Sequence, residues 1–174
     1  MQVPPFSLSQ QLADLGPELD EAALRVLRSG QYIGGTEIQS FETAFAAVVG
    51  TAHAVGCNSG TDALILALRA LGIGAGDEVI TASFSFFATA EAISAVGATP
   101  VFVDVDPLTY LIDLDQITSA ITPATKALIP VHLFGRPVDM TRLMAIAKDH
   151  NLAVVEFSTF LNLVSRIIKC QPLS

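Results

Sequence analysis

The feature of the sequence that most constrains its fold is a regular alternation of short apolar runs with helix-like segments. Apolar runs typical of buried strands occupy residues 52–57, 78–81, 100–104, 126–132 and 152–155. Helix-like segments separate them at 61–71, 88–96, 113–120 and 139–150. Strand and helix in turn predict an α/β fold with a mostly parallel, helix-covered sheet. The carboxyl ends of such strands meet at one edge, where ligands usually bind.

Two further helices are predicted before this alternating region. Residues 18–29 carry apolar side chains at helical spacing and end at Gly30, and Thr36 opens a second helical stretch that ends at Gly50. The chain contains no internal repeat, low-complexity tract or linker. One domain is therefore the simplest interpretation.

The composition excludes several functional classes. Apolar residues make up 51% of the chain, which a parallel sheet buried on both faces explains. No apolar stretch reaches the ~18–20 uninterrupted residues that a membrane crossing needs, so no membrane partner is expected. A net charge of −8 with nine basic residues argues against nucleic-acid binding. The start of the chain has no secretory pattern, and Cys57 and Cys170 lack metal-ligand spacing, which together favour a cytoplasmic protein with free thiols.

The turn at residues 58–62, Asn-Ser-Gly-Thr-Asp, is the clearest candidate binding element. It is predicted to join the strand 52–57 to the helix 61–71, where unpaired backbone N–H groups and the helix dipole favour a phosphate. The alternative is an ordinary helix cap formed by Ser59 or Thr61, with Asp62 in the first turn. The turn lacks a Walker lysine, and the glycines at 72–76 follow a helix, so neither is a nucleotide-binding fingerprint.

Four polar residues near strand ends are weaker candidates. Asp104 and Asp106 offer a carboxylate pair for acid–base work or metal binding, but capping and turn formation before Pro107 is the favoured interpretation. His132 and Arg136 follow a strand, where an active site can recruit them. A hydrogen-bonded strand end and a turn residue are the favoured roles for these two.

An ordered series of segments makes the chain similar to a known family. The segments are GQYIGGTE at 30–37, FE at 41–42, NSGTDAL at 58–64, GDEVIT at 76–81, FFATA at 86–90, GATPVFVDVD at 97–106 and PVHLFGRPVD at 130–139. In this order they resemble the DegT/DnrJ/EryC1/StrS aminotransferases from residue 1 to about 156. The resemblance implies the N-terminal part of the large domain of a fold-type I enzyme that depends on pyridoxal 5′-phosphate (PLP).

Membership would also imply an activity and its partners. Family members commonly transfer an amino group from glutamate to a keto group of a nucleotide-linked sugar, in polysaccharide, lipopolysaccharide or antibiotic-sugar biosynthesis. They work as homodimers or larger assemblies.

The resemblance also assigns roles to particular residues of this chain. It places Ser59, Gly60, Thr61 and Asp62 at the cofactor phosphate and Phe86 on the face of the pyridine ring, where a flat side chain suits a flat cofactor. Core packing is the alternative for Phe86, since Phe84, Phe86 and Phe87 cluster and some of them are expected in the core. Tyr32, Gly34 and Gly35 match a family loop near the subunit interface and the substrate.

The chain departs from the family pattern after Glu156. PLP enzymes need a lysine that forms the Schiff base and a carboxylate that keeps the pyridine nitrogen protonated. The family carboxylate would follow Glu156, but this chain has Phe157 there, and Lys126, Lys148 and Lys169 all fall outside the family position. No catalytic residue is therefore assigned. Residues 1–156 are interpreted as the partial aminotransferase domain and residues 157–174 as a tail that does not match it.

The tail is expected to form an amphipathic helix along its apolar positions. These are Leu161, Val164, Ile167 and Ile168.

Two functions from different classes remain open at this stage. The first is an aminotransferase by descent of which this chain is an inactive part, and the second is a non-catalytic dimerising or binding module with at most weak phosphate or PLP affinity. An unrelated α/β hydrolase or nucleotide enzyme would need a G-x-S-x-G or P-loop motif, and the sequence has neither.

Overall fold

The structure is a computed structural model that describes residues 7–158 and 163–169. It divides into two compact units, Met1–Gly56 and Cys57–Ser174, which are described separately below. Within the described residues, no helix is both long and apolar enough to cross a membrane.

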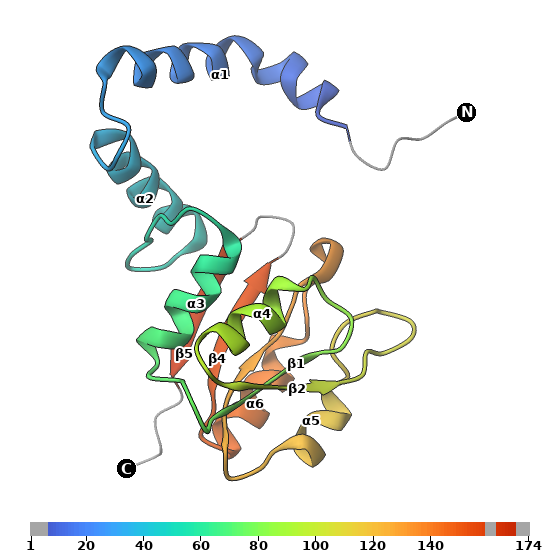
Figure 1. The fold of residues 1–174 in the computed structure, drawn as a ribbon. Helices are drawn as coiled ribbons and strands as arrows, with labels where there is room; N and C mark the ends of the chain where they lie inside the picture. Colours follow the sequence, from blue (N-terminus) through green and yellow to red (C-terminus); the bar gives the residue numbers. More distant parts are fainter. Residues whose placement is uncertain (1–6, 159–162, 170–174) are drawn as a thin grey trace. The chain divides into compact units, whose positions relative to one another are not determined.

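The first unit is built on two helices, α1 (Ser9–Ser29) and α2 (Thr36–Val49) (Figure 1). Helix α2 agrees with the prediction, whereas α1 begins nine residues before the predicted start at residue 18. The sequence misleads here because Pro17 is typical of a first helical turn, yet the helix continues through it. Both helices end at a glycine with positive φ, 70° at Gly30 and 73° at Gly50. This backbone conformation is less strained for glycine than for a residue with a Cβ atom.

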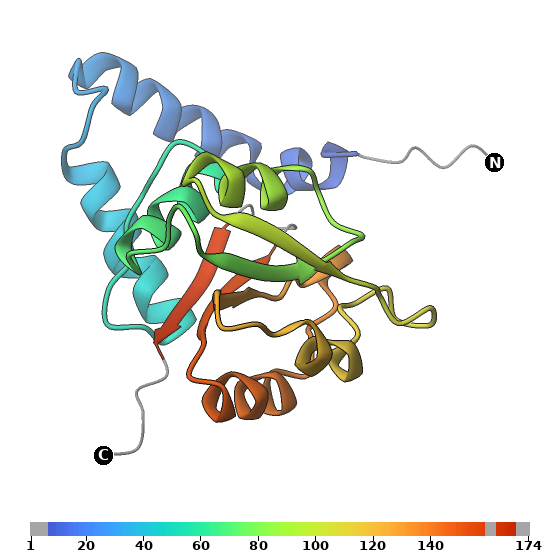
Figure 2. The ribbon, with the colours of Figure 1, turned by 60° about the horizontal axis from the view of Figure 1, so that its bottom comes forward.

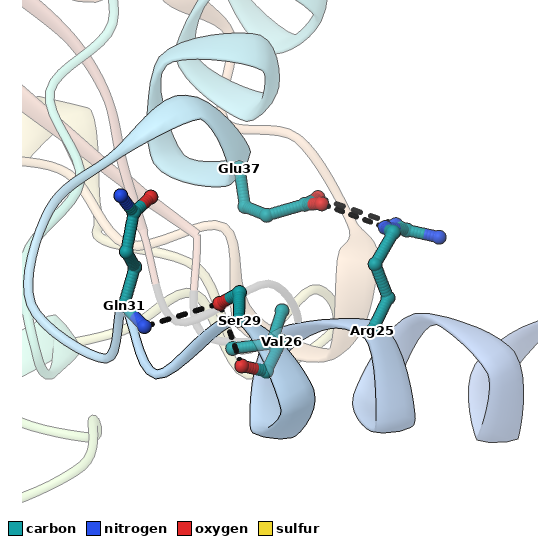
Figure 3. A network of polar contacts seen from close by, with 5 residues as sticks. All are labelled: Arg25, Val26, Ser29, Gln31 and Glu37. Carbon is teal, nitrogen blue, oxygen red and sulfur yellow. Dashed lines mark hydrogen bonds and ion pairs between the residues drawn. The ribbon is translucent and has the colours of Figure 1, made fainter.

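A network of polar contacts joins the end of α1 to the start of α2 (Figure 3). Arg25 Nε donates to Glu37 Oε1 at 2.8 Å, and this bond and the charge of Arg25 lower the pKa of the Glu37 carboxyl. Ser29 Oγ donates to the Val26 carbonyl at 2.8 Å and accepts from the Gln31 N–H at 3.1 Å. Because the Arg25–Glu37 pair is exposed to solvent, it orients the connection more than it stabilises the fold.

The strand predicted at residues 52–57 is wrong, because this segment forms no strand in the described structure. The Gly56 N–H donates to the Glu42 side chain, Oε1, at 2.8 Å, so it is not available to a sheet. A Cβ built at Gly56 would lie 2.5 Å from Ile38 Cδ1, so the absence of a side chain allows close packing on α2. An apolar run becomes a strand only beside a partner strand, and its own composition does not supply one.

The second unit contains a five-stranded sheet in the order β2-β1-β3-β4-β5 (Figure 1). The strands are β1 (Glu78–Ala82), β2 (Thr99–Val103), β3 (Thr125–Ile129), β4 (Ala153–Ser158) and β5 (Leu163–Lys169). The first four pair in parallel, which confirms the predicted mostly parallel α/β fold. The helices are α3 (Gly60–Ala70), α4 (Ala88–Ala95), α5 (Leu114–Ala120) and α6 (Met140–Asp149), with a short 3₁₀ turn, η1 (Leu133–Gly135).

The amphipathic helix expected in the tail is wrong, because residues Leu163–Lys169 form β5. This strand pairs antiparallel with β4, from Ser158 opposite Leu163 to Ala153 opposite Lys169. Without it β4 would be an unpaired edge, which is a ready template for an added strand. Leu161, the first apolar position of the expected helix, lies outside the described residues. The domain limit between residues 156 and 157 stays a prediction.

Helices cover both faces of the sheet and create two apolar cores. Figure 2 shows α3 and α4 on one side of the sheet and α5 and α6 on the other. Neighbouring strand residues divide between the two sides: Val79 and Val155 pack with Leu64 of α3, whereas Ile80 and Val154 belong to the opposite cluster. This alternation on a sheet covered on both faces explains why the strands read as continuous apolar runs.

We expect Leu64→Ala to lower the free energy of unfolding by about 2–5 kcal/mol, because Leu64 is fully buried (0% exposed) and its loss leaves a cavity. Leu66→Ala in the same helix is the matched control, since Leu66 is 51% exposed and should change stability by less than about 1 kcal/mol. Urea denaturation of both variants measures the difference. Equal losses would contradict the burial of α3 on the sheet.

Candidate functional site

A pocket of about 440 Å³ lies in the second unit, where α3 begins and β4 ends. It is lined by Cys57, Asn58, Ser59, Gly60, Thr61, Phe86, Ala88 and Phe157. These residues come from three separate parts of the chain: the start of α3, the connection from β1 to α4, and the carboxyl end of β4. The pocket therefore lies at the carboxyl edge of the parallel strands, as expected for a site in such a sheet.

Ser59 shapes the α3 side of this pocket. Its backbone is extended, and its Oγ accepts a hydrogen bond from the Asp62 N–H at 3.1 Å, so it is the N-cap of α3. The first intrahelical bond runs from the Ala63 N–H to the Ser59 carbonyl at 3.0 Å. The N–H groups of Gly60 and Thr61 precede that bond and have no helical carbonyl to use. The capping alternative is thus confirmed for Ser59, and the same turn also lines a pocket.

Asp62 is the predicted site residue that does not line the pocket. Its carboxylate accepts a hydrogen bond from Ser59 Oγ at 2.9 Å, which engages it at the cap. Of the predicted cofactor residues, the structure brings Ser59, Gly60, Thr61 and Phe86 together in one pocket. Ser59 and Thr61 add hydroxyl groups to the lining, and none of the described lining residues is acidic.

The aromatic cluster after β1 differs from the expectation that part of it is core. Phe84, Phe86 and Phe87 are all exposed, with Phe86 70% exposed. Phe84 contacts the ring of Tyr110, with 6.1 Å between centroids. The run lies in the connection beyond the sheet edge, where the chain has left the layer that helices cover. Phe86 therefore offers an aromatic face to the pocket without a structural role in the core.

Phe157 lines the pocket although the sequence assigned it no site role. It is 2% exposed, its N–H donates to the Pro130 carbonyl at 3.1 Å, and its carbonyl accepts from the His132 N–H at 2.9 Å. These bonds fix its backbone against the end of the neighbouring strand. A signal was present, because Phe157 directly follows the position where the family pattern stops, at the carboxyl end of a predicted strand.

His132 is engaged by Glu156 and does not line the pocket. Its Nε2 lies 2.9 Å from Glu156 Oε1, and its Nδ1 accepts the Val138 N–H at 3.1 Å. Because Nδ1 is an acceptor, Nε2 is the nitrogen that donates the hydrogen bond to the Glu156 carboxylate. The favoured interpretation of His132 as a hydrogen-bonded strand-end residue is confirmed. Arg136 lies in the turn after η1, with its N–H bonded to the Leu133 carbonyl.

Of the two aspartates after β2, Asp106 forms a turn. Asp106 Oδ1 accepts the N–H groups of Leu108 at 3.0 Å and Thr109 at 2.8 Å, which confirms the turn interpretation for this residue. The Thr109 hydrogen bonds are the largest cause of a lowered pKa at Asp106. Asp104 Oδ1 accepts the N–H of the next residue, Val105, at 2.8 Å, and Asp104 lies before the turn. Among the described residues, no group of three or more His, Cys, Asp or Glu side chains could hold a metal ion.

All three lysines belong to the opposite edge of the sheet. Lys126 is the second residue of β3, and Lys148 lies in the last turn of α6, just before β4. The backbone of Lys169 pairs with Ala153, the first residue of β4. Since parallel strands place all their amino ends at one edge, the three positions lie away from the pocket at the carboxyl edge.

The predicted loop at residues 32–35 belongs to the first unit. Tyr32 Oη donates to the Leu27 carbonyl at 2.9 Å, and Gly34 and Gly35 have φ values of 66° and 93°. These bonds and dihedrals define a tight connection between α1 and α2. The role of this loop near a substrate stays a prediction.

Comparison with known sequences connects this geometry to one family. The DegT/DnrJ/EryC1/StrS aminotransferase family matches residues 13–158. A UDP-N-acetyl-3-dehydro-alpha-D-glucosamine 3-aminotransferase of Acidithiobacillus ferrooxidans is 51% identical over 154 residues, which are 88% of this chain and 42% of the relative. A dTDP-3-amino-3,4,6-trideoxy-alpha-D-glucose transaminase of Streptomyces venezuelae is 50% identical over 155 residues, 89% of this chain and 41% of the relative.

Solved structures show the same fold. S. venezuelae DesV in complex with a ketimine intermediate superposes with a TM-score of 0.85 at 50% identity, over 89% of this chain and 42% of that chain. The NtdA protein of Bacillus subtilis with bound cofactor PMP gives a TM-score of 0.84 at 36% identity, over 89% of this chain and 36% of that chain.

The chain spans about 42% of the length of the curated relatives above. Within that span the match is nearly continuous, and it includes both the turn at α3 and the strands that carry the pocket. The agreement in sequence and in fold shows that this chain belongs to the DegT/DnrJ/EryC1/StrS aminotransferase family, whose members depend on PLP.

Proposed function

We propose that the pocket at the start of α3 binds the phosphate and ring of PLP, as part of a sugar aminotransferase. One observation carries the proposal: the turn Ser59–Thr61 and Phe86, distant in sequence, line the same pocket. In the reaction an amino group would pass from a glutamate-type donor to a keto group of a nucleotide-linked sugar. The relatives support this class of substrate, because their names describe aminotransferases of UDP- and dTDP-linked sugars.

The phosphate end of the pocket fits an anion. The Gly60 and Thr61 N–H groups stand at the positive end of the dipole of α3, an eleven-residue helix. Asn58, Ser59 and Thr61 add polar side chains to the lining. No lining residue is acidic, and the Asp62 carboxylate is engaged by Ser59 Oγ. A phosphate would thus meet donors without a repelling charge in the lining.

The ring end of the pocket fits a flat aromatic group. Phe86 is exposed enough to offer one face, and Ala88 and Phe157 supply the apolar remainder of the lining. When bound, PLP supplies an electron sink for the transfer of the amino group. The residues of this chain would hold the phosphate, orient the ring and exclude water from its face.

The positions of the lysines favour a second candidate function for the 174-residue chain by itself, a non-catalytic binding module. Lys126, Lys148 and Lys169 all lie at the amino edge of the parallel strands, so none is placed to bond a cofactor in the pocket. The chain alone would then bind phosphate or PLP without turning over a substrate. A cytoplasmic location and assembly into homodimers or larger oligomers belong to the proposal for the whole enzyme.

We expect Thr61→Asp to weaken binding of pyridoxamine 5′-phosphate by at least about tenfold, because it adds a negative charge where the phosphate would lie. The same change should not lower stability, since an acidic residue in a first helical turn is favourable. Fluorescence titration of the ligand and thermal unfolding measure the two effects. Thr36→Asp, at the exposed first residue of α2, is the matched control and should leave binding unchanged.

Dephosphorylated pyridoxamine tests the same proposal from the side of the ligand. It should bind the unmodified chain much more weakly than pyridoxamine 5′-phosphate, because it lacks the anion. Equal affinities for the two ligands would reject the phosphate end of the pocket.

We expect the 174-residue chain, incubated with PLP and reduced with borohydride, to show no pocket-directed labelling of a lysine. Because surface lysines can react with PLP without any pocket, the criterion is whether inorganic phosphate competes with the labelling. Labelling at Lys126, Lys148 or Lys169, mapped by peptide mass spectrometry, should be the same with and without excess inorganic phosphate. Labelling of one lysine that phosphate suppresses would show that this lysine reaches the pocket.

A further inference from the structure

Phe157 occupies a fixed place at the ring end of the pocket. Its N–H donates to the Pro130 carbonyl and its carbonyl accepts from the His132 N–H, so its backbone is held against the segment that follows β3. Its side chain is 2% exposed and packs in the core cluster with Val155 and Val131, on the side of the sheet that α3 and α4 cover. A residue at position 157 therefore faces the pocket and the α3 side, whatever its chemistry.

The carboxylate beside it in sequence lies on the other face. Successive strand residues alternate between the faces of a sheet, and Glu156 accordingly contacts His132, at 2.9 Å, outside the pocket lining. Within the part of the chain that the structure describes, every residue that lines the pocket is uncharged. The pocket thus has anion-binding amides at its phosphate end and no negative charge at its ring end.

This distribution of charge disfavours a cationic ring. A positive charge against an apolar wall loses hydration and gains no partner, whereas a neutral aromatic ring loses little. PLP enzymes ordinarily place a charged or polar partner at the ring nitrogen. Phe157 offers an aromatic side chain at that end of the pocket, so these residues fit the phosphate and the flat ring but not a protonated ring nitrogen.

We infer that Phe157 makes this pocket selective for a phosphate monoester that carries an uncharged aromatic ring, over the same ester with a cationic ring. The inference rests on the proposed phosphate pocket and adds the ring specificity.

The test uses two probes of the same shape at pH 7.5, 3-methylbenzyl phosphate and (N-methylpyridinium-3-yl)methyl phosphate. They differ only in the permanent ring charge, so their phosphate ends contribute equally. Ligand-observed NMR, with inorganic phosphate as the competitor, gives their relative affinities for the 174-residue chain. We expect the neutral probe to bind at least about tenfold more tightly, the ratio that corresponds to one pKa unit of preference for the neutral form.

Two variants isolate the role of Phe157. Phe157→Asp should reduce or reverse the preference by supplying a carboxylate, whereas Phe157→Asn, of the same size and without the charge, should not favour the cationic probe. Circular dichroism melting tests whether both variants are folded. If they are not, the ratio of the affinities of the unmodified chain for the neutral and the cationic probe decides the inference. Equal affinity for both probes, or a preference for the cationic one, would overturn the ring specificity while leaving the phosphate site standing.

Failure of the phosphate site gives a different result. If inorganic phosphate displaces neither probe, the proposed phosphate pocket is wrong and the inference falls with it. If the preference for the neutral ring is the same in Phe157→Asp as in the unmodified chain, the specificity does not come from Phe157.

Discussion

Burial of a parallel sheet on both faces is the constraint on which the second unit depends. Adjacent strand residues such as Val79 and Ile80 must both be apolar, because one packs under α3 and α4 and the other over α5 and α6. Parallel pairing then requires a helix between successive strands and gathers their carboxyl ends at one edge. The pocket lies at that edge because the connections leave the covered layers there.

The pocket combines two kinds of surface with separate origins. The start of α3 contributes backbone, since any helix start leaves N–H groups without carbonyl partners, and the cap by Ser59 leaves those of Gly60 and Thr61 in this state. The aromatic lining residues are Phe86 from a connection and Phe157 from a strand. In the proposed site, a substitution at an aromatic position would change which ring fits while the backbone N–H groups persist.

Sequence patterns predicted the elements that carry their own signals. The helices α2 to α6 and the strands β1 to β4 agree with the predicted segments to within a few residues, because their apolar spacing reflects burial on the sheet. Apart from the start of α1, where Pro17 misleads, the errors are cases that depend on a neighbouring segment. The run 52–57 has no partner strand, residues Leu163–Lys169 found one in β4, and the phenylalanines after β1 lie beyond the covered layers. Local composition does not determine such partners.

The sequence by itself determined the alternation of strands and helices, the capped turn at residues 58–62 and the family, since these rest on residue types in a fixed order along the chain. Only the tertiary structure decided that this turn, Phe86 and Phe157 share one pocket, and that the Asp62 carboxylate accepts a hydrogen bond from Ser59 Oγ without lining that pocket. It also decided that the lysines stand at the opposite edge of the sheet. The physical reason is that strand order and strand direction arise from pairing between segments that are distant in the sequence. They decide which residues come together, and the sequence of a single segment does not specify them.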